Sequence, residues 1–121
     1  MAQLTIQHIA HIPSKSRNHY TGSNRFEEGF HLYRLTSVER NAVGFLIEKV
    51  VIFRASLDYK QFASHGNPRS YSSVQALLEG ENTKAELYKN QLKTSMPIGV
   101  YSFSPQEMES AHQIWNEIAV S

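Results

Sequence analysis

Two histidines near the start of the chain have a spacing that can bind a metal ion. His8 and His11 are three residues apart, and on a helix they would share one face, as zinc ligands do. The residues around them alternate between apolar and polar, which favours a strand, and on a regular strand the two side chains point to opposite sides. The sequence offers no third ligand close by. We therefore expect no metal site.

Nucleophilic and nucleotide-dependent chemistry has little support in the sequence. A serine, a histidine and an acid can meet in space to form a triad, but the G-x-S-x-G turn of many hydrolases is absent. The phosphate-binding patterns G-x-x-x-x-G-K-[ST] and G-x-G-x-x-G are absent as well. The chain contains no cysteine, which excludes thiolate nucleophiles, thiolate zinc sites and disulfide bonds. We expect no cofactor and favour a non-enzymatic protein.

One enzymatic pattern is present as three separated segments. They are Leu32-Tyr33-Arg34 in a predicted strand, Ser70-Tyr71-Ser72, and Glu107-Met108-Glu109. In this order they resemble the ADP-ribosyltransferases, which use an arginine, a serine motif and a pair of glutamates to hold NAD and orient the attacking group. The two glutamates here fall in the first turn of a predicted helix, where capping and the helix dipole also account for them. The resemblance implies a small ADP-ribosyltransferase-like enzyme as one alternative function.

A long loop over residues 13–29 holds most of the candidate residues for binding a partner. Loops longer than about 12–15 residues are uncommon in compact domains and are usually functional or disordered. Cations can bind phosphates while aromatic rings stack on bases, and tyrosine and arginine are also common anchors in protein interfaces. The alternative is a surface loop whose aromatic rings only attach it to the core. The candidate binding residues of this loop are Lys15, Arg17, His19, Tyr20, Arg25 and Phe26.

A second loop repeats the combination of a cation and an aromatic ring. Residues 64–73 read SHGNPRSYSS, in which the Gly-Asn-Pro sequence specifies a turn. We add Arg69 and Tyr71 to the candidate binding residues. The serines that follow are able to bind an anion at the start of a helix, but helix capping and solvation are the simpler explanation.

The elements that must position these loops form an α+β pattern. Alternation and β-branched residues predict strands over residues 4–13, 30–37, 43–54 and 97–103. The charged pair Glu48-Lys49 inside the third of these strands predicts a bulge or an end that projects beyond the sheet. Helices are expected over residues 57–63, 73–78 and 83–93, with a break near Gly80 between the last two.

The clearest local signal opens the last helix. Ser104, Pro105 and Glu107 have the pattern of a capping box with proline at the first helical position. The apolar residues that follow at helical spacing predict one face packed on the sheet, with Trp115 in the core. A competing capping box over residues 36–39 would begin a helix, but the β-branched residues that follow favour a strand there.

These patterns together predict one α+β domain over residues 1–121. It has an antiparallel or mixed sheet of about four strands flanked by two to four helices, in the order β-β-β-α-α-β-α. The longest apolar runs, Val43–Ile47 and Val50–Phe53, are far shorter than the roughly 20 residues that cross a bilayer. With no secretory signal visible, we expect a cytoplasmic protein that does not bind a membrane.

The charge distribution decides between two classes of partner. Residues 1–71 contain nine Lys/Arg and five Asp/Glu, a net of +4, and residues 72–121 contain three and six, a net of −3, giving +1 in all. This net charge and a pI near 8.1 fall below the basic footprint of a nucleic-acid domain. We therefore expect a small binding protein (a regulator, inhibitor or adaptor) that engages another protein through its basic-aromatic loops. A nucleic-acid-binding accessory protein is the alternative, and an open sheet edge would allow a homodimer.

Overall fold

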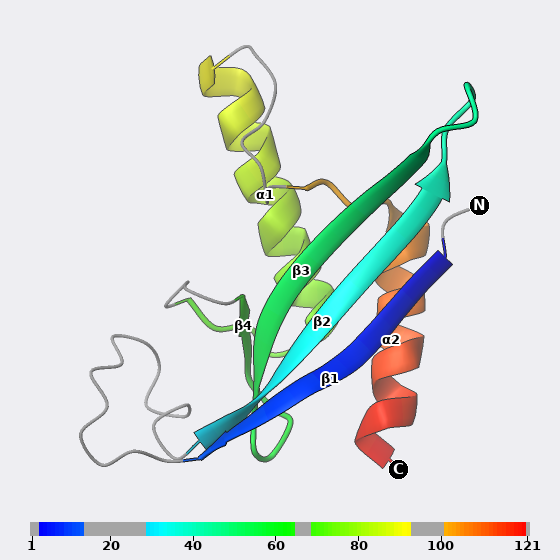
Figure 1. Cartoon of the computed structure of the whole chain (residues 1–121). Helices are drawn as coiled ribbons and strands as arrows, with labels where there is room; N and C mark the ends of the chain where they lie inside the picture. Colours follow the sequence, from blue (N-terminus) through cyan, green and yellow to red (C-terminus); the bar gives the residue numbers. More distant parts are fainter. Residues whose placement is uncertain (1–2, 14–28, 65–68, 93–100, 121) are drawn as a thin grey trace.

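The computed structural model describes residues 3–13, 29–64, 69–92 and 101–120, in which four strands precede two helices. The strands form one antiparallel sheet in the order β1-β2-β3-β4 (Figure 1). The α+β fold class predicted from the sequence is confirmed, and the sheet is antiparallel. No described helix is long and apolar enough to cross a membrane. The elements are β1 (Gln3–Pro13), β2 (Gly29–Arg40), β3 (Leu46–Ser56), β4 (Phe62–Ser64), α1 (Val74–Leu92) and α2 (Pro105–Val120).

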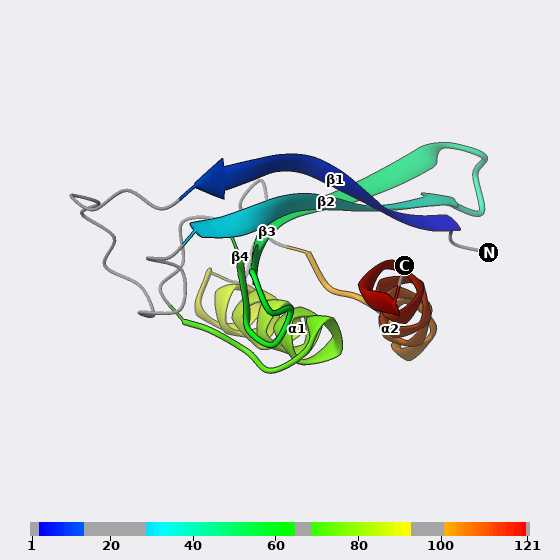
Figure 2. The ribbon, with the colours of Figure 1, turned by 90° about the horizontal axis from the view of Figure 1, so that it is seen from below.

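The two helices lie on the same face of the sheet, and neither lies on the other face (Figure 2). This arrangement follows from the alternation of side chains along a strand. In β2, Tyr33 and Leu35 point toward the helices and are buried, whereas Arg34 between them is exposed on the open face. One side of the sheet therefore holds the main core, and on the other side Phe30 and Ala63 form a smaller buried cluster near one end of the sheet.

The core between the two layers is built around Trp115 of α2, as the sequence predicts. The Trp115 ring packs edge-on against Tyr33, Phe53 and Phe62, with ring centres 4.9, 5.8 and 5.1 Å away. Aromatic pairs favour this edge-to-face geometry. Trp115 thus joins α2 to three of the four strands and fixes the helix on the sheet.

The segment predicted as a short helix over residues 57–63 is instead a tight turn followed by β4. The hydroxyl of Ser56 accepts hydrogen bonds from the backbone N–H groups of Lys60 and Gln61, at 3.2 and 2.9 Å. Tyr59 has a φ of 59°, in the left-handed region that a right-handed helix does not use. The chain therefore turns back at Ser56 and pairs residues 62–64 with β3.

The break predicted near Gly80 is also wrong, because α1 is one continuous helix. Ser73 caps its start, where its Oγ accepts a hydrogen bond from the N–H of Ala76 at 3.0 Å. The Thr83 hydroxyl donates to the C=O of Glu79 in the preceding turn and does not cap a new helix. A glycine inside a helix costs only about 1 kcal/mol relative to alanine, so tertiary packing can override it.

The strand predicted over residues 97–103 is not formed in its described part, Tyr101–Phe103, and residues 97–100 lie outside the described residues. Asn82 of α1 takes the place of a neighbouring strand here. Its Oδ1 accepts a hydrogen bond from the N–H of Phe103 at 2.6 Å, and its Nδ2 donates to the C=O of Phe103 at 2.9 Å. The backbone of Phe103 needs no other partner. The fourth strand therefore precedes both helices, which differs from the predicted order of elements.

The β2–β3 hairpin extends beyond the rest of the sheet (Figure 1). In the part of the chain that the structure describes, β1 pairs with β2 as far as Val38, whereas β2 and β3 pair regularly up to Arg40 and Leu46. A projecting end is therefore present, but the charged pair Glu48-Lys49 from which it was predicted lies in the part of the sheet that β1 also joins, opposite Val38 and Ser37. Residues 36–39 lie within β2, so the interpretation of them as the start of a helix is wrong. A bulge does occur in the sheet, but it lies in β1.

Candidate functional site

Most of the binding residues predicted from the sequence belong to the first loop and lie outside the described residues. Their role in binding a partner therefore stays a prediction. They are Lys15, Arg17, His19, Tyr20, Arg25 and Phe26.

The two candidates of the second loop, Arg69 and Tyr71, lie together beside α1. The guanidinium carbon of Arg69 is 5.6 Å from the centre of the Tyr71 ring, within the range of a cation–π contact. Tyr71 exchanges two backbone hydrogen bonds with Phe62, at 2.8 and 2.7 Å, and its half-buried ring lies against Gly80. Tyr71 therefore attaches this loop to the fold, and Arg69 is the exposed member of the pair.

The end of the β2–β3 hairpin is a further surface, which no pattern in the sequence indicated. Its turn is built around Asn41, whose Oδ1 accepts hydrogen bonds from the backbone N–H groups of Val43 and Phe45, each at 3.0 Å. Gly44 has a φ of 100°, a conformation that costs glycine little. The C=O of Gly44 accepts a hydrogen bond from the Arg40 guanidinium at 2.6 Å. The turn is thus held in one shape by its own hydrogen bonds.

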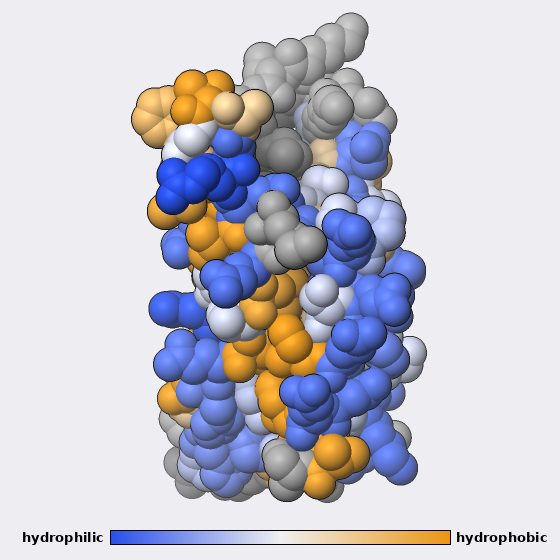
Figure 3. All heavy atoms as spheres, turned by 90° about the vertical axis from the view of Figure 1, so that its right-hand side faces the viewer, coloured by the Kyte–Doolittle hydropathy of each residue, from blue (hydrophilic) through white to orange (hydrophobic). Residues whose placement is uncertain are grey.

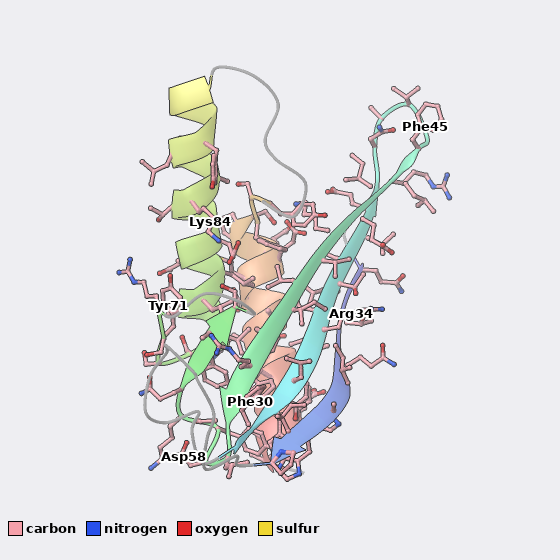
Figure 4. All side chains as sticks on the ribbon, turned by 60° about the vertical axis from the view of Figure 1, so that its left-hand side comes forward. Phe30, Arg34, Phe45, Asp58, Tyr71 and Lys84 are labelled. Carbon is pink, nitrogen blue, oxygen red and sulfur yellow. The ribbon has the colours of Figure 1, made fainter. Side chains whose placement is uncertain are left out.

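This turn presents four large apolar side chains to solvent. The exposed fractions are 79% for Val43, 70% for Phe45, 63% for Leu46 and 44% for Ile47. We call these four residues the apolar tip. Phe45 lies at the far end of the hairpin, well away from Tyr71 (Figure 4). A contiguous exposed apolar patch is a mark of an interaction site, whereas single exposed apolar residues are ordinary.

Near the apolar tip, the first turn of α2 is attached to the sheet by Glu107. The predicted capping box is confirmed: Oγ of Ser104 accepts from the N–H of Glu107 at 3.1 Å, and Oε1 of Glu107 accepts from the N–H of Ser104 at 2.9 Å. The same carboxylate also accepts hydrogen bonds from the hydroxyl of Ser37 on β2 and from Nζ of Lys49 on β3, the latter at 2.9 Å. A local helix cap therefore serves as a tertiary link to both central strands.

The ionised form of Glu107 is favoured although only 4% of the residue is exposed. Burial by itself would raise the pKa of this carboxyl group. The hydrogen bonds from the Ser104 backbone, Ser37 and Lys49, together with the charge of Lys49, outweigh burial and place the pKa of Glu107 below its ordinary value. Lys49 also donates to the C=O of Ser102 at 2.8 Å, which fixes its ammonium group further.

A hollow of about 710 Å³ lies between the helix-facing side of the hairpin and the first turns of α2. Its charged lining residues are Glu39, Lys49, Glu107 and Glu109. Ile47 of the apolar tip is directly opposite Glu39 in the β2–β3 ladder, so the tip and the hollow adjoin. With three carboxylates against one ammonium, the hollow suits a polar or cationic side chain of a partner more than a phosphate.

Three histidines meet at the other end of the sheet. The expectation that His8 and His11 point to opposite sides is wrong, because a bulge between His8 and Ala10 adds one residue to β1. Both histidines therefore share the helix-facing side with His31 of β2. Nε2 of His8 is 3.1 Å from Nδ1 of His31, and the ring of His11 stacks on that of His31 with centres 4.9 Å apart.

The environment of His31 favours its neutral form. Burial, followed by the neighbouring imidazoles of His11 and His8, lowers the pKa of His31 below 6.5. Within the described part of the chain, no three His, Asp or Glu side chains are arranged to hold a metal ion. Only the pairing of β1 with β2 could have revealed the cluster, because His31 is far from His11 in sequence.

The three segments that resemble ADP-ribosyltransferases are not brought together. Arg34 is exposed on the open face of the sheet (Figure 4), whereas Glu107 is buried on the other face. Ser70 and Ser72 flank Tyr71 beside α1, apart from both of them. An arginine, a serine and a glutamate pair around one substrate, as the resemblance implies, are not found in this arrangement.

No protein-family model matches this chain, and no match is found among curated proteins or among solved structures.

Proposed function

We propose that this chain is a non-enzymatic binding protein that engages another protein through the apolar tip of the β2–β3 hairpin. The observation that carries the proposal is the exposure of four large apolar side chains on a turn fixed by its own hydrogen bonds. Exposed apolar patches promote aggregation unless a partner covers them. A turn that is already ordered also loses little conformational entropy on binding, which favours affinity.

Phe45 is the side chain that we expect to contribute most to binding. It is 70% exposed at the far end of the hairpin, and aromatic residues are frequent hot spots of protein interfaces. A partner with an apolar cleft for this ring would also cover Val43 and Leu46. Ile47, opposite Glu39, would extend the contact into the hollow.

The charges near the apolar tip favour a protein over a nucleic acid. Arg40 donates to the C=O of Gly44, and Lys49 is paired with Glu107, so both cations are engaged within the chain. The carboxylates that line the hollow would repel a phosphate backbone. The nucleic-acid alternative depends on the cations of the first loop, which lie outside the described residues.

The experiment begins by identifying the partner with a photo-crosslinking analogue of phenylalanine at position 45. The captured protein is then purified and titrated with this chain by isothermal titration calorimetry. Phe45→Ser is expected to weaken binding about 30-fold, the loss that accompanies removal of a hot-spot residue. Leu87→Ser is the matched control, because Leu87 on α1 is also apolar and 54% exposed, and it should leave the affinity unchanged.

Three outcomes would overturn the proposal. If Phe45→Ser binds as well as the wild type while alanine at Lys15, Arg17 and Arg25 abolishes binding, the site is the first loop. Saturable binding of DNA or RNA that weakens steeply with salt, and is lost in the same alanine variant, would favour the nucleic-acid alternative. Binding of lipid vesicles that is lost in Phe45→Ser would make the apolar tip a membrane anchor.

A further inference from the structure

The two edges of the sheet differ in how they are protected. β4, at one edge, has three residues, and its Phe62 pairs on the outer side with Tyr71. β1, at the other edge, has 11 residues, and no segment in the described part of the chain pairs with its outer side. An open edge of this length presents a row of backbone donors and acceptors to any strand that can approach.

β1 also lacks the charges that usually protect such an edge. Its sequence, QLTIQHIAHIP, contains no Lys, Arg, Asp or Glu. Exposed edges are commonly blocked by charged residues, by proline or by a bulge. The bulge between His8 and Ala10 and the terminal Pro13 protect only the second half of β1. The first half, residues 3–8, pairs regularly with β2 and has an uncharged outer edge.

An apolar band lies beside this first half, where β1 packs on α2. Leu4 and Ile6 of β1, together with Met108 and Ile118 of α2, pack against the core but are only partly buried. Figure 3, which views the molecule from this side, shows an apolar band between hydrophilic flanks. A strand added to the outer edge of β1 would cover the β1 side of this band.

We infer that β1 of a second copy of this chain occupies this edge, and that antiparallel pairing centred near Ile6 joins two sheets into one. A two-fold axis at this point would place Thr5 of one copy opposite Gln7 of the other, and Leu4 opposite His8. The absence of charged residues in β1 favours a second copy of β1 as the added strand. Two identical charged strands would repel each other, whereas two uncharged strands do not. A charged foreign strand would find no complementary charge on β1.

The inference is independent of the proposed function, because the apolar tip and the edge of β1 are different surfaces. The pairing would also bring the apolar bands of the two copies side by side, so that each copy covers part of the apolar band of the other. Both copies contribute the same residues, as the symmetry of such a dimer requires.

The first test is sedimentation equilibrium of the full chain from low to high micromolar concentration, where we expect a reversible dimer. The double variant Thr5→Lys/Gln7→Lys should weaken association about tenfold or more, because two like-charged pairs then face each other across the axis. Both side chains are exposed, so the fold should be retained, which circular dichroism checks. Thr83→Lys/Leu87→Lys adds the same charge to exposed positions of α1 and should still form the dimer.

The second test uses the absence of native cysteine, which allows one nitroxide label at Gln7→Cys. Electron paramagnetic resonance should give a short distance between the labels of two copies, and a longer one for the control Thr83→Cys. A wild type that stays monomeric, a lysine variant that associates as strongly as the wild type, or a long distance at position 7 would each overturn the inference. Loss of the dimer in Phe45→Ser instead would assign the contact to the apolar tip.

Discussion

Lys49 and Glu107 form an ion pair that joins β3 to the first turn of α2, with 2.9 Å between Nζ and Oε1. The exposed fraction is 19% for the Lys49 side chain and 3% for the Glu107 side chain. Because both groups are largely removed from water, each charge offsets the unfavourable burial of the other. Loss of one group leaves the other charge buried without its partner. The pair therefore positions the start of α2 and one wall of the hollow.

Glu107→Gln is expected to lower the free energy of unfolding by about 3 kcal/mol, the size found when one partner of a buried ion pair is removed. It leaves Lys49 uncompensated and weakens the links to Ser37 and Ser104. Urea denaturation followed by circular dichroism measures the loss. Glu109→Gln, at an exposed position of the same turn, is the control and should change stability by less than about 0.5 kcal/mol.

The pH dependence gives Glu107 a second signature in the same experiment. Its pKa in the folded protein lies below 4.5, so folding favours the ionised carboxylate. The contribution to stability is complete above pH 4.5 and is lost as the pH falls through the lower pKa of the folded protein. The stability difference between wild type and Glu107→Gln should therefore shrink in acid. A difference that does not change with pH would contradict this role.

The histidine cluster predicts a second loss of stability on acidification, at a higher pH than the loss due to Glu107. The pKa of His31 in the folded protein lies below 6.5, so the unfolded chain binds a proton more readily. The contribution of the neutral imidazole is complete above pH 6.5 and is lost as the pH falls through the lower, folded-state pKa. Thermal unfolding across this range should show a smaller decline for His31→Gln than for wild type. The control His112→Gln, an exposed histidine of α2, should decline as the wild type does.

Among the described residues, the titratable side chains that face His31 are two histidines and two tyrosines. His8 and His11 approach it from β1, and the ring of Tyr59 stacks on it with centres 5.4 Å apart. Tyr33 lies farther along β2, with its ring centre 6.4 Å away, and burial raises its pKa, so it stays neutral in the range measured. Equal pH profiles for wild type and His31→Gln would show that the cluster is not linked to folding.

Gly80→Ala tests the contact between Tyr71 and α1. Helix propensity alone predicts a gain of about 1 kcal/mol for this substitution. A β-carbon at position 80 would lie 2.6 Å from Cζ of Tyr71, however, so the ring would have to move. We expect a net loss of about 1–2 kcal/mol, measured by urea denaturation. In the Tyr71→Ala background the same substitution should be stabilising, and a loss there as well would contradict the contact.

Asn41→Ala is expected to loosen the apolar tip without unfolding the sheet. It removes the acceptor for the N–H groups of Val43 and Phe45, so hydrogen exchange at these two amides should become faster. Global stability should fall by about 1 kcal/mol. Asn116→Ala is the control, because its side chain bonds only to the exposed His112 among the described contacts. Unchanged exchange at both amides would show that Asn41 does not hold the turn.

The sequence by itself determined the features that depend on near neighbours along the chain. Alternation marked β1 and the central strands, because a strand places successive side chains on opposite faces. Ser104 and Glu107 marked the start of α2, because both capping bonds close within one turn. The position of Trp115 in the core followed from the spacing of apolar residues on that helix. These signals were sufficient for the α+β fold class.

Tertiary contacts decided the rest of the fold. Residues 57–64 form a turn and β4, because the Ser56 hydroxyl binds the turn and β3 offers a free edge. Phe103 needs no strand, because the side chain of Asn82 satisfies its backbone. Asn82 and Phe103 are 21 residues apart in the sequence, so local propensity did not indicate this contact.

The candidate sites were also decided by tertiary structure. The bulge in β1 reverses the alternation and places His8 and His11 on one face, although their spacing predicts opposite faces. The residues of the apolar tip read as ordinary strand residues in the sequence, and they are exposed only because the hairpin extends past β1 and the helices. Whether an apolar side chain is buried depends on what lies across from it, and that is set by strand register and helix packing, not by local sequence.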